Sequence, residues 1–101
     1  MENLIQGYEL LDNGLKNYII KKLFMTYKHL EITASSEDGI NTIKLQFDGI
    51  EDIVLDKYGA DSVISKLNLS KTEDDMLLAK IEDSEDVEMK IISKKLVATR
   101  V

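Results

Sequence analysis

The sequence predicts an α+β fold: a single domain over residues 1–101, mainly antiparallel β-sheet, with one or two short helices packed on one face. A chain of 101 residues has room for one hydrophobic core. Residues 30–34 and 43–47 alternate apolar and polar side chains, the pattern of strands with one buried face. Between them, Asp38-Gly39 readily supplies the positive φ of a hairpin loop. These observations predict a central antiparallel hairpin whose apolar face the other elements must cover.

The N-terminal segment is predicted to be a short helix or a packed irregular arm. Its apolar residues recur at helical spacing, and Gly7 interrupts them. They are Leu4, Ile5, Tyr8 and Leu11. A turn at residues 12–14 then begins the folded domain proper.

Residues 15–27 fit either a helix or a strand. Their β-branched and aromatic content favours a strand. The side chains that would share one face of this strand, with Lys21 as an exception, are Ile19, Leu23, Met25 and Tyr27. The step from Tyr27 to Lys28 predicts a tight hairpin into the following strand.

The middle of the chain is predicted to contain the short helices. After a turn at Asp48-Gly49, residues 50–58 fit one side of a helix or a buried strand over 53–55. Asp61 or Ser62 can cap a second short helix. That helix would bury Val63, Ile64 and Leu67.

The last third is predicted to return to strands. Residues 77–81 and 87–91 each alternate apolar and polar positions. Turns are expected at residues 83–86 and 93–95, before a final strand over 96–101. The absence of proline from the chain leaves charged residues or helices to protect the sheet edges.

Composition narrows the possible functions. The net charge of −6 and pI of about 4.7 disfavour ordinary nucleic-acid binding, because phosphates repel an acidic chain. The absence of cysteine excludes disulfides, thiolate metal sites and cysteine nucleophiles. No apolar run approaches the roughly 20 residues of a membrane span, and Met1-Glu2-Asn3 is no basic secretory start. We therefore expect a cytoplasmic protein without membrane partners.

No motif predicts catalytic, cofactor-binding or metal-binding residues. His29 is the only histidine, and it falls out of phase with Leu30 and Ile32, so we expect it to point to solvent. The five glycines match no phosphate-binding pattern and are better explained by turns. The turns at residues 12–14 and 38–39 lack the further oxygen ligands of a calcium loop. Paired carboxylates could serve a glycosidase, but so acidic a chain offers many such pairs by chance.

Charge is unevenly distributed near the C-terminus. Residues 73–88 contain eight acids and one base, net −7, whereas residues 89–101 carry +4. The acidic residues proposed to bind a partner are Glu82, Asp83, Glu85, Asp86 and Glu88. The alternative is that they only solvate a turn. Under the first interpretation, this segment is a docking face for a basic protein.

The order of motifs resembles that of small uncharacterised bacterial proteins, including immunity proteins of polymorphic toxin systems. The matching stretches cover most of the chain: residues 12–20, LEITA at 30–34, IKLQFDGI at 43–50 and VEMKII at 87–92. The resemblance implies stoichiometric neutralisation of a toxin, often a basic nuclease, and it transfers no functional residues.

Three functions remain as hypotheses. The first is a non-catalytic protein-binding module, such as a toxin-neutralising immunity protein, that docks an acidic surface on a basic protein. The alternative is a homodimeric structural or regulatory protein that associates through a strand edge. The third is a small carboxylate-dependent enzyme.

Overall fold

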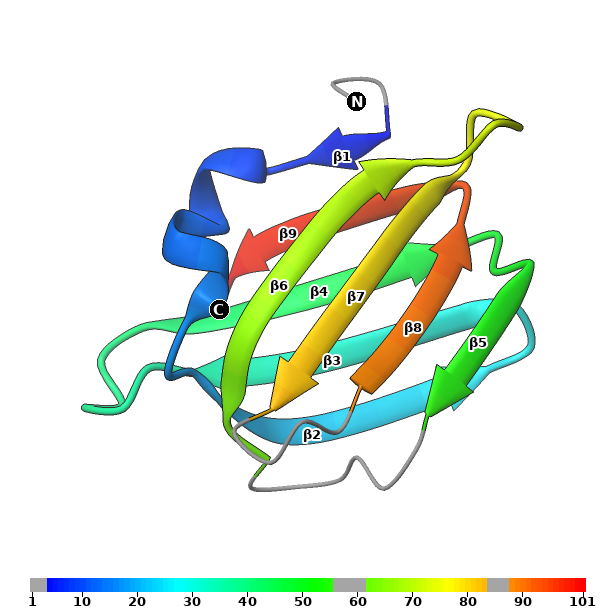
Figure 1. Ribbon diagram of the computed structural model, residues 1–101. Helices are drawn as coiled ribbons and strands as arrows, with labels where there is room; N and C mark the ends of the chain where they lie inside the picture. Colours follow the sequence, from blue (N-terminus) through cyan, green and yellow to red (C-terminus); the bar gives the residue numbers. More distant parts are fainter. Residues whose placement is uncertain (1–3, 56–61, 84–87) are drawn as a thin grey trace.

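Two β-sheets packed face to face form the protein, and their strands cross at an angle (Figure 1). The structure, a computed structural model, describes residues 4–55, 62–83 and 88–101. Helical structure in these residues is limited to two 3-10 turns, η1 (Tyr8–Leu10) and η2 (Asp12–Leu15). The prediction of an α+β fold with helices on one face is therefore wrong, and the fold is β-rich. The second sheet, rather than a helix, covers the apolar face of the first.

The first sheet is built around the predicted central hairpin. Its strand order is β1 (Ile5–Gln6), β9 (Lys95–Arg100), β4 (Thr42–Asp48), β3 (His29–Ser35) and β2 (Ile19–Thr26). The buried residues of β3 and β4 lie directly opposite each other, namely Leu30 with Phe47, Ile32 with Leu45 and Ala34 with Ile43. The period-two alternation thus predicted both strands and their buried face correctly.

The second sheet has the order β5 (Asp52–Leu55), β8 (Glu88–Ser93), β7 (Leu77–Asp83) and β6 (Ile64–Lys71). Residues 53–55 do form a strand, but it is an edge strand in which Val54 is 49% exposed, so its predicted burial is wrong. The strands expected in the last third are correct. The helix predicted from Ser62 is wrong, because Ile64–Lys71 is a strand antiparallel to β7. The other proposed cap, Asp61, lies outside the described residues.

A register shift explains why β6 resembles a helix in sequence. Ile64 and Leu67 are both buried although they are three residues apart, a spacing that puts side chains on opposite faces of a regular strand. The pairing with β7 shifts between Ile64 and Lys66, so Ser65 is an extra residue in the strand. Burial at an interval of three therefore comes from a β-bulge.

The same device occurs in β2, which is a strand as favoured from the sequence. Its pairing with β3 shifts between Ile20 and Lys22, so Lys21 is the extra residue. Ile20 is consequently buried, whereas Ile19 lies opposite Ser35 and, contrary to the prediction, does not share the face of Leu23 and Met25. Two residues, 27 and 28, connect β2 to β3, which confirms the predicted tight hairpin.

The two sheets are joined where β2 and β6 begin. The N–H of Ile20 donates to the carbonyl of Ser62 at 2.8 Å, and the N–H of Ile64 donates to the carbonyl of Tyr18 at 2.7 Å. An isolated antiparallel bridge links Ile19 and Val63 between these bonds. This closure holds the first residues of β2 and leaves the rest of the strand at an edge of the sheet.

The N-terminal segment packs as an irregular arm, the second of the two alternatives predicted for it. β1 pairs with β9 in parallel, and η1 and η2 then lead toward β6 (Figure 1). Leu11 and Leu15 are buried in the core. Among the described residues, no helix has the length and apolar character needed to cross a membrane.

Candidate functional site

The predicted acidic residues lie at one end of the second sheet. Glu82 near the end of β7 lies directly opposite Glu88 at the start of β8, and Asp83 ends β7 opposite Ile64. Glu85 and Asp86 lie outside the described residues. The structure therefore brings two of the five proposed residues together as a cross-strand pair.

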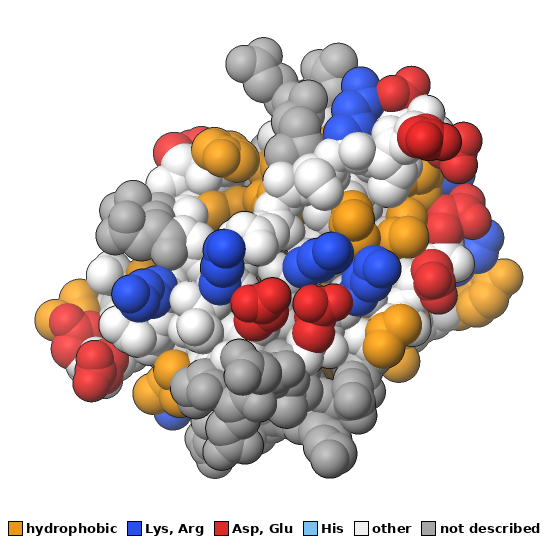
Figure 2. All heavy atoms as spheres, in the orientation of Figure 1, with side chains coloured by type: hydrophobic (Ala, Val, Ile, Leu, Met, Phe, Trp, Pro, Cys, Tyr) orange, Lys and Arg blue, Asp and Glu red, His pale blue; other side chains and the backbone are white. Residues whose placement is uncertain are grey.

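Lysines surround this glutamate pair on the outer face of the second sheet. Lys66 lies opposite Glu82, and in the next row Lys80 lies opposite Lys90. Figure 2 shows blue and red side chains next to one another across this face. Like charges directly opposite each other destabilise a sheet slightly, but each pair here is bordered by the opposite charge. The described part of this face is therefore mixed in charge, and an acidic docking face remains a prediction.

His29 forms an ordered cluster on the outer face of the first sheet. Its Nδ1 lies 2.5 Å from Oδ1 of Asp48, and its Nε2 lies 2.8 Å from Oε2 of Glu31. Lys44 Nζ lies 3.2 Å from the other carboxylate oxygen of Glu31. The expected face is correct, but the His29 side chain is only 24% exposed and is held between two partners. The hairpin register creates this cluster, because it places His29 opposite Asp48.

The cluster favours a protonated histidine. Only the imidazolium can donate a hydrogen bond from both ring nitrogens. The hydrogen bonds to Glu31 and Asp48 raise the pKa of His29 above its usual 6.5, and the bond to Glu31 has the larger effect. The hydrogen bonds from His29 and Lys44 lower the pKa of Glu31 below its usual 4.5, and the bond from His29 has the larger effect. In the described segments, no group of three or more His, Cys, Asp or Glu residues is arranged to hold a metal ion.

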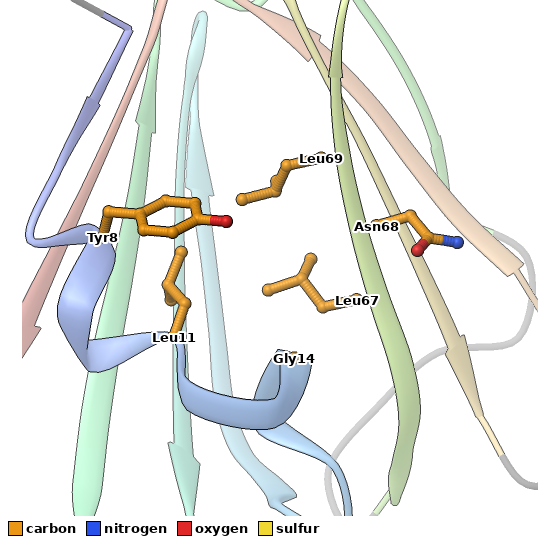
Figure 3. A pocket seen from close by; sticks show the side chains of 6 residues that line it. All are labelled: Tyr8, Leu11, Gly14, Leu67, Asn68 and Leu69. Atoms are coloured by element: carbon orange, nitrogen blue, oxygen red, sulfur yellow. The ribbon is translucent and has the colours of Figure 1, made fainter. Parts of the chain in front are cut away.

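A hollow of about 250 Å³ separates the N-terminal arm from β6 (Figure 3). Its lining consists of Tyr8, Leu11, Gly14, Leu67, Asn68 and Leu69. The ring of Tyr8 extends across the opening toward Leu69, whereas the side chain of Asn68 points away (Figure 3). This lining carries no carboxylate, imidazole or amine that could act as a catalytic acid or base.

An exposed surface at the edge of the first sheet is the strongest candidate site, and the sequence reasoning missed it. We define the β2 edge surface as Lys21, Lys22, Phe24, Met25 and Tyr27. Phe24 is 56% exposed, Met25 53% and Tyr27 89%. Within the described part of the chain, the backbone from Lys21 to Thr26 pairs only with β3. The surface therefore combines large apolar side chains with unpaired strand backbone.

The geometry of β2 explains the exposure of both faces. Phe24 lies opposite Glu31 on the outer face, whereas Met25 lies opposite the buried Leu30. Met25 and Tyr27 line a hollow of about 330 Å³ with Ile53 of β5. The uncharged run at residues 23–27 was visible in the sequence, but its exposure depends on β2 being an edge strand.

Comparison with known proteins does not assign the chain to a family. No protein-family model matches it, and no curated protein is significantly similar to it in sequence.

Proposed function

We propose that this chain is a non-catalytic protein-binding module that contacts its partner through the β2 edge surface. The observation that carries the proposal is that three large apolar side chains, each more than half exposed, lie within four residues: Phe24 and Met25 on the edge strand β2, and Tyr27 in the turn that follows it. Exposed apolar groups next to unpaired strand backbone mark either a docking site or an aggregation hazard. Binding a partner would bury these groups and satisfy that backbone.

A toxin-neutralising immunity protein is the particular form of this proposal that the motif order supports. Such a protein acts stoichiometrically, so it needs a docking surface and no catalytic group. The net charge of −6 agrees with a basic target such as a nuclease. Under this proposal the acidic residues 82–88 would steer association, and the apolar edge would hold the complex.

The test compares capture of a partner by variants of the full chain. We expect Phe24→Ser with Tyr27→Ser to keep the fold, because both side chains are largely exposed, and to lose most of the captured partner. Ile40→Ser is the matched control, because Ile40 is 79% exposed but lies in the loop between β3 and β4. The readout is mass spectrometry of proteins captured from the native cell, after circular dichroism has verified folding. Equal capture by the double variant and the control would refute the proposal.

A homodimer through the same strand edge is the competing hypothesis. Sedimentation at several protein concentrations distinguishes the two functions. A mass that doubles with concentration in the parent, and not in the double variant, would favour the homodimer.

A further inference from the structure

The part of the chain that forms the β2 edge is basic, although the whole protein is acidic. Residues 13–30 contain no acid and four lysines in a chain of net charge −6. These lysines are Lys16, Lys21, Lys22 and Lys28. Exposed charges act over about 8–10 Å at physiological salt, so this local charge governs what can lie against the strand.

The outer face beside β2 has the same character. A shallow hollow of about 420 Å³ is lined by Lys21, Lys22, Lys44 and Phe24, together with Thr33, Glu31 and Val101. Its one acidic side chain, Glu31, is already bound by Lys44 and His29. The hollow therefore presents two lysines outside any described ion pair, next to an exposed aromatic ring.

We propose that β2 pairs with an extended strand of another protein that carries acidic side chains on one face and apolar side chains on the other. This inference rests on the proposed function and names the chemistry of the one strand that the partner adds, whereas the net charge of −6 concerns the partner as a whole. The incoming backbone would bond to those N–H and C=O groups of residues 21–26 that have no partner among the described residues because they point away from β3, as in other cases of strand addition. Its acidic face would lie beside Lys21 and Lys22, which both line the outer hollow, and its apolar face would lie beside Leu23 and Met25.

The alternation of β2 after its bulge sets these two faces. Lys22 and Phe24 lie opposite Thr33 and Glu31 on the outer face. Leu23 and Met25 lie opposite Ile32 and Leu30, which are buried. Because side chains alternate in the added strand as well, one of its faces meets Lys22 and the ring of Phe24, and the other meets Leu23 and Met25.

A second copy of the chain is a poorer occupant of this edge. Two antiparallel β2 strands would bring Lys21 and Lys22 of both copies into one interface, and β2 contains no acid to pair with them. Like charges facing each other across strands are destabilising. The net charge of −6 on each copy adds further repulsion.

The experiment uses the full ¹⁵N-labelled chain and two synthetic peptides, one alternating glutamate with valine and the other alternating lysine with valine. We expect the glutamate peptide to shift the amide signals of residues 21–27 and slow their exchange with solvent. It should bind on the order of tenfold more tightly than the lysine peptide, the scale of two exposed ion pairs.

Charge reversal provides the decisive comparison. Lys21→Glu with Lys22→Glu should exchange the preference of the two peptides, and the neutral Lys21→Gln with Lys22→Gln should abolish it without added repulsion. The matched control is Lys80→Glu with Lys90→Glu, a cross-strand lysine pair on the other sheet, which should leave the preference of the parent unchanged. Circular dichroism verifies the fold of each variant.

The inference is overturned if the parent binds both peptides equally, if neither peptide perturbs β2, or if the parent dimerises through β2. If the peptides fail while Phe24→Ser with Tyr27→Ser still abolishes partner capture, the proposed function stands and only the partner's chemistry is wrong. If that double variant captures its partner normally, the proposed function itself fails.

Discussion

Replacing Leu45 tests how tightly the two sheets pack, because Leu45 lies on the central strand of the first sheet. It is fully buried on β4, between Ile32 of β3 and Ala98 of β9. Leu45→Ala removes three carbon atoms from this site, and their lost transfer free energy alone is about 2 kcal/mol. The remaining cavity adds to this value, because strands paired on both sides of β4 cannot collapse into it. We expect a total loss of about 3–5 kcal/mol in the free energy of unfolding.

Urea denaturation followed by circular dichroism measures this loss. The midpoint should fall while the slope stays unchanged, which would show that the variant loses stability without a change in the surface exposed on unfolding. Ile40→Ala is the control, because Ile40 is 79% exposed and its truncation should change stability by less than about 0.5 kcal/mol. A loss below about 0.5 kcal/mol for Leu45→Ala would refute the register given for β4.

Three further predictions concern the His29 cluster, the N-terminal arm and the charged outer face. His29→Gln should lower the free energy of unfolding below pH 6.5, because the protonated His29 of the parent is stabilised by Glu31 and Asp48 in the folded state only. The difference between parent and variant should shrink as the pH rises through the raised pKa of His29. A difference that stays constant from about pH 6 to 9 would contradict the cluster. Gly7→Ala should destabilise the fold strongly, because the φ of Gly7 is +80° and the new Cβ would lie 2.1 Å from the Ala98 carbonyl oxygen. An unchanged melting temperature would show that the N-terminal arm is not docked on β9. Glu88→Gln removes the repulsion from Glu82 but also the attraction to Lys80 and Lys90, so the free energy of unfolding should change by less than about 0.5 kcal/mol in urea denaturation at low salt; a larger gain would show that the lysines do not offset the glutamate pair.

Much of the fold follows from local sequence patterns. The alternation in residues 30–34 and 43–47 predicted β3, β4 and their buried side chains, because the side-chain period of a strand is two. The same reasoning predicted β7 and β8. It failed at residues 63–67, where a β-bulge mimics helical spacing. A bulge depends on how two strands pair, so a pattern read along one strand does not reveal it.

The candidate site depends more on tertiary structure. The sequence by itself determined that His29 lies on the outer face and that residues 23–27 are uncharged. The tertiary structure decided that Asp48 and Glu31 enclose His29, because the hairpin register sets which residues face each other. It also decided that β2 is an edge strand, which exposes Phe24 and Met25. The pattern of apolar residues shows which side chains can be buried. The order of strands in a sheet decides which of them are covered by a neighbouring strand and which stay exposed at an edge.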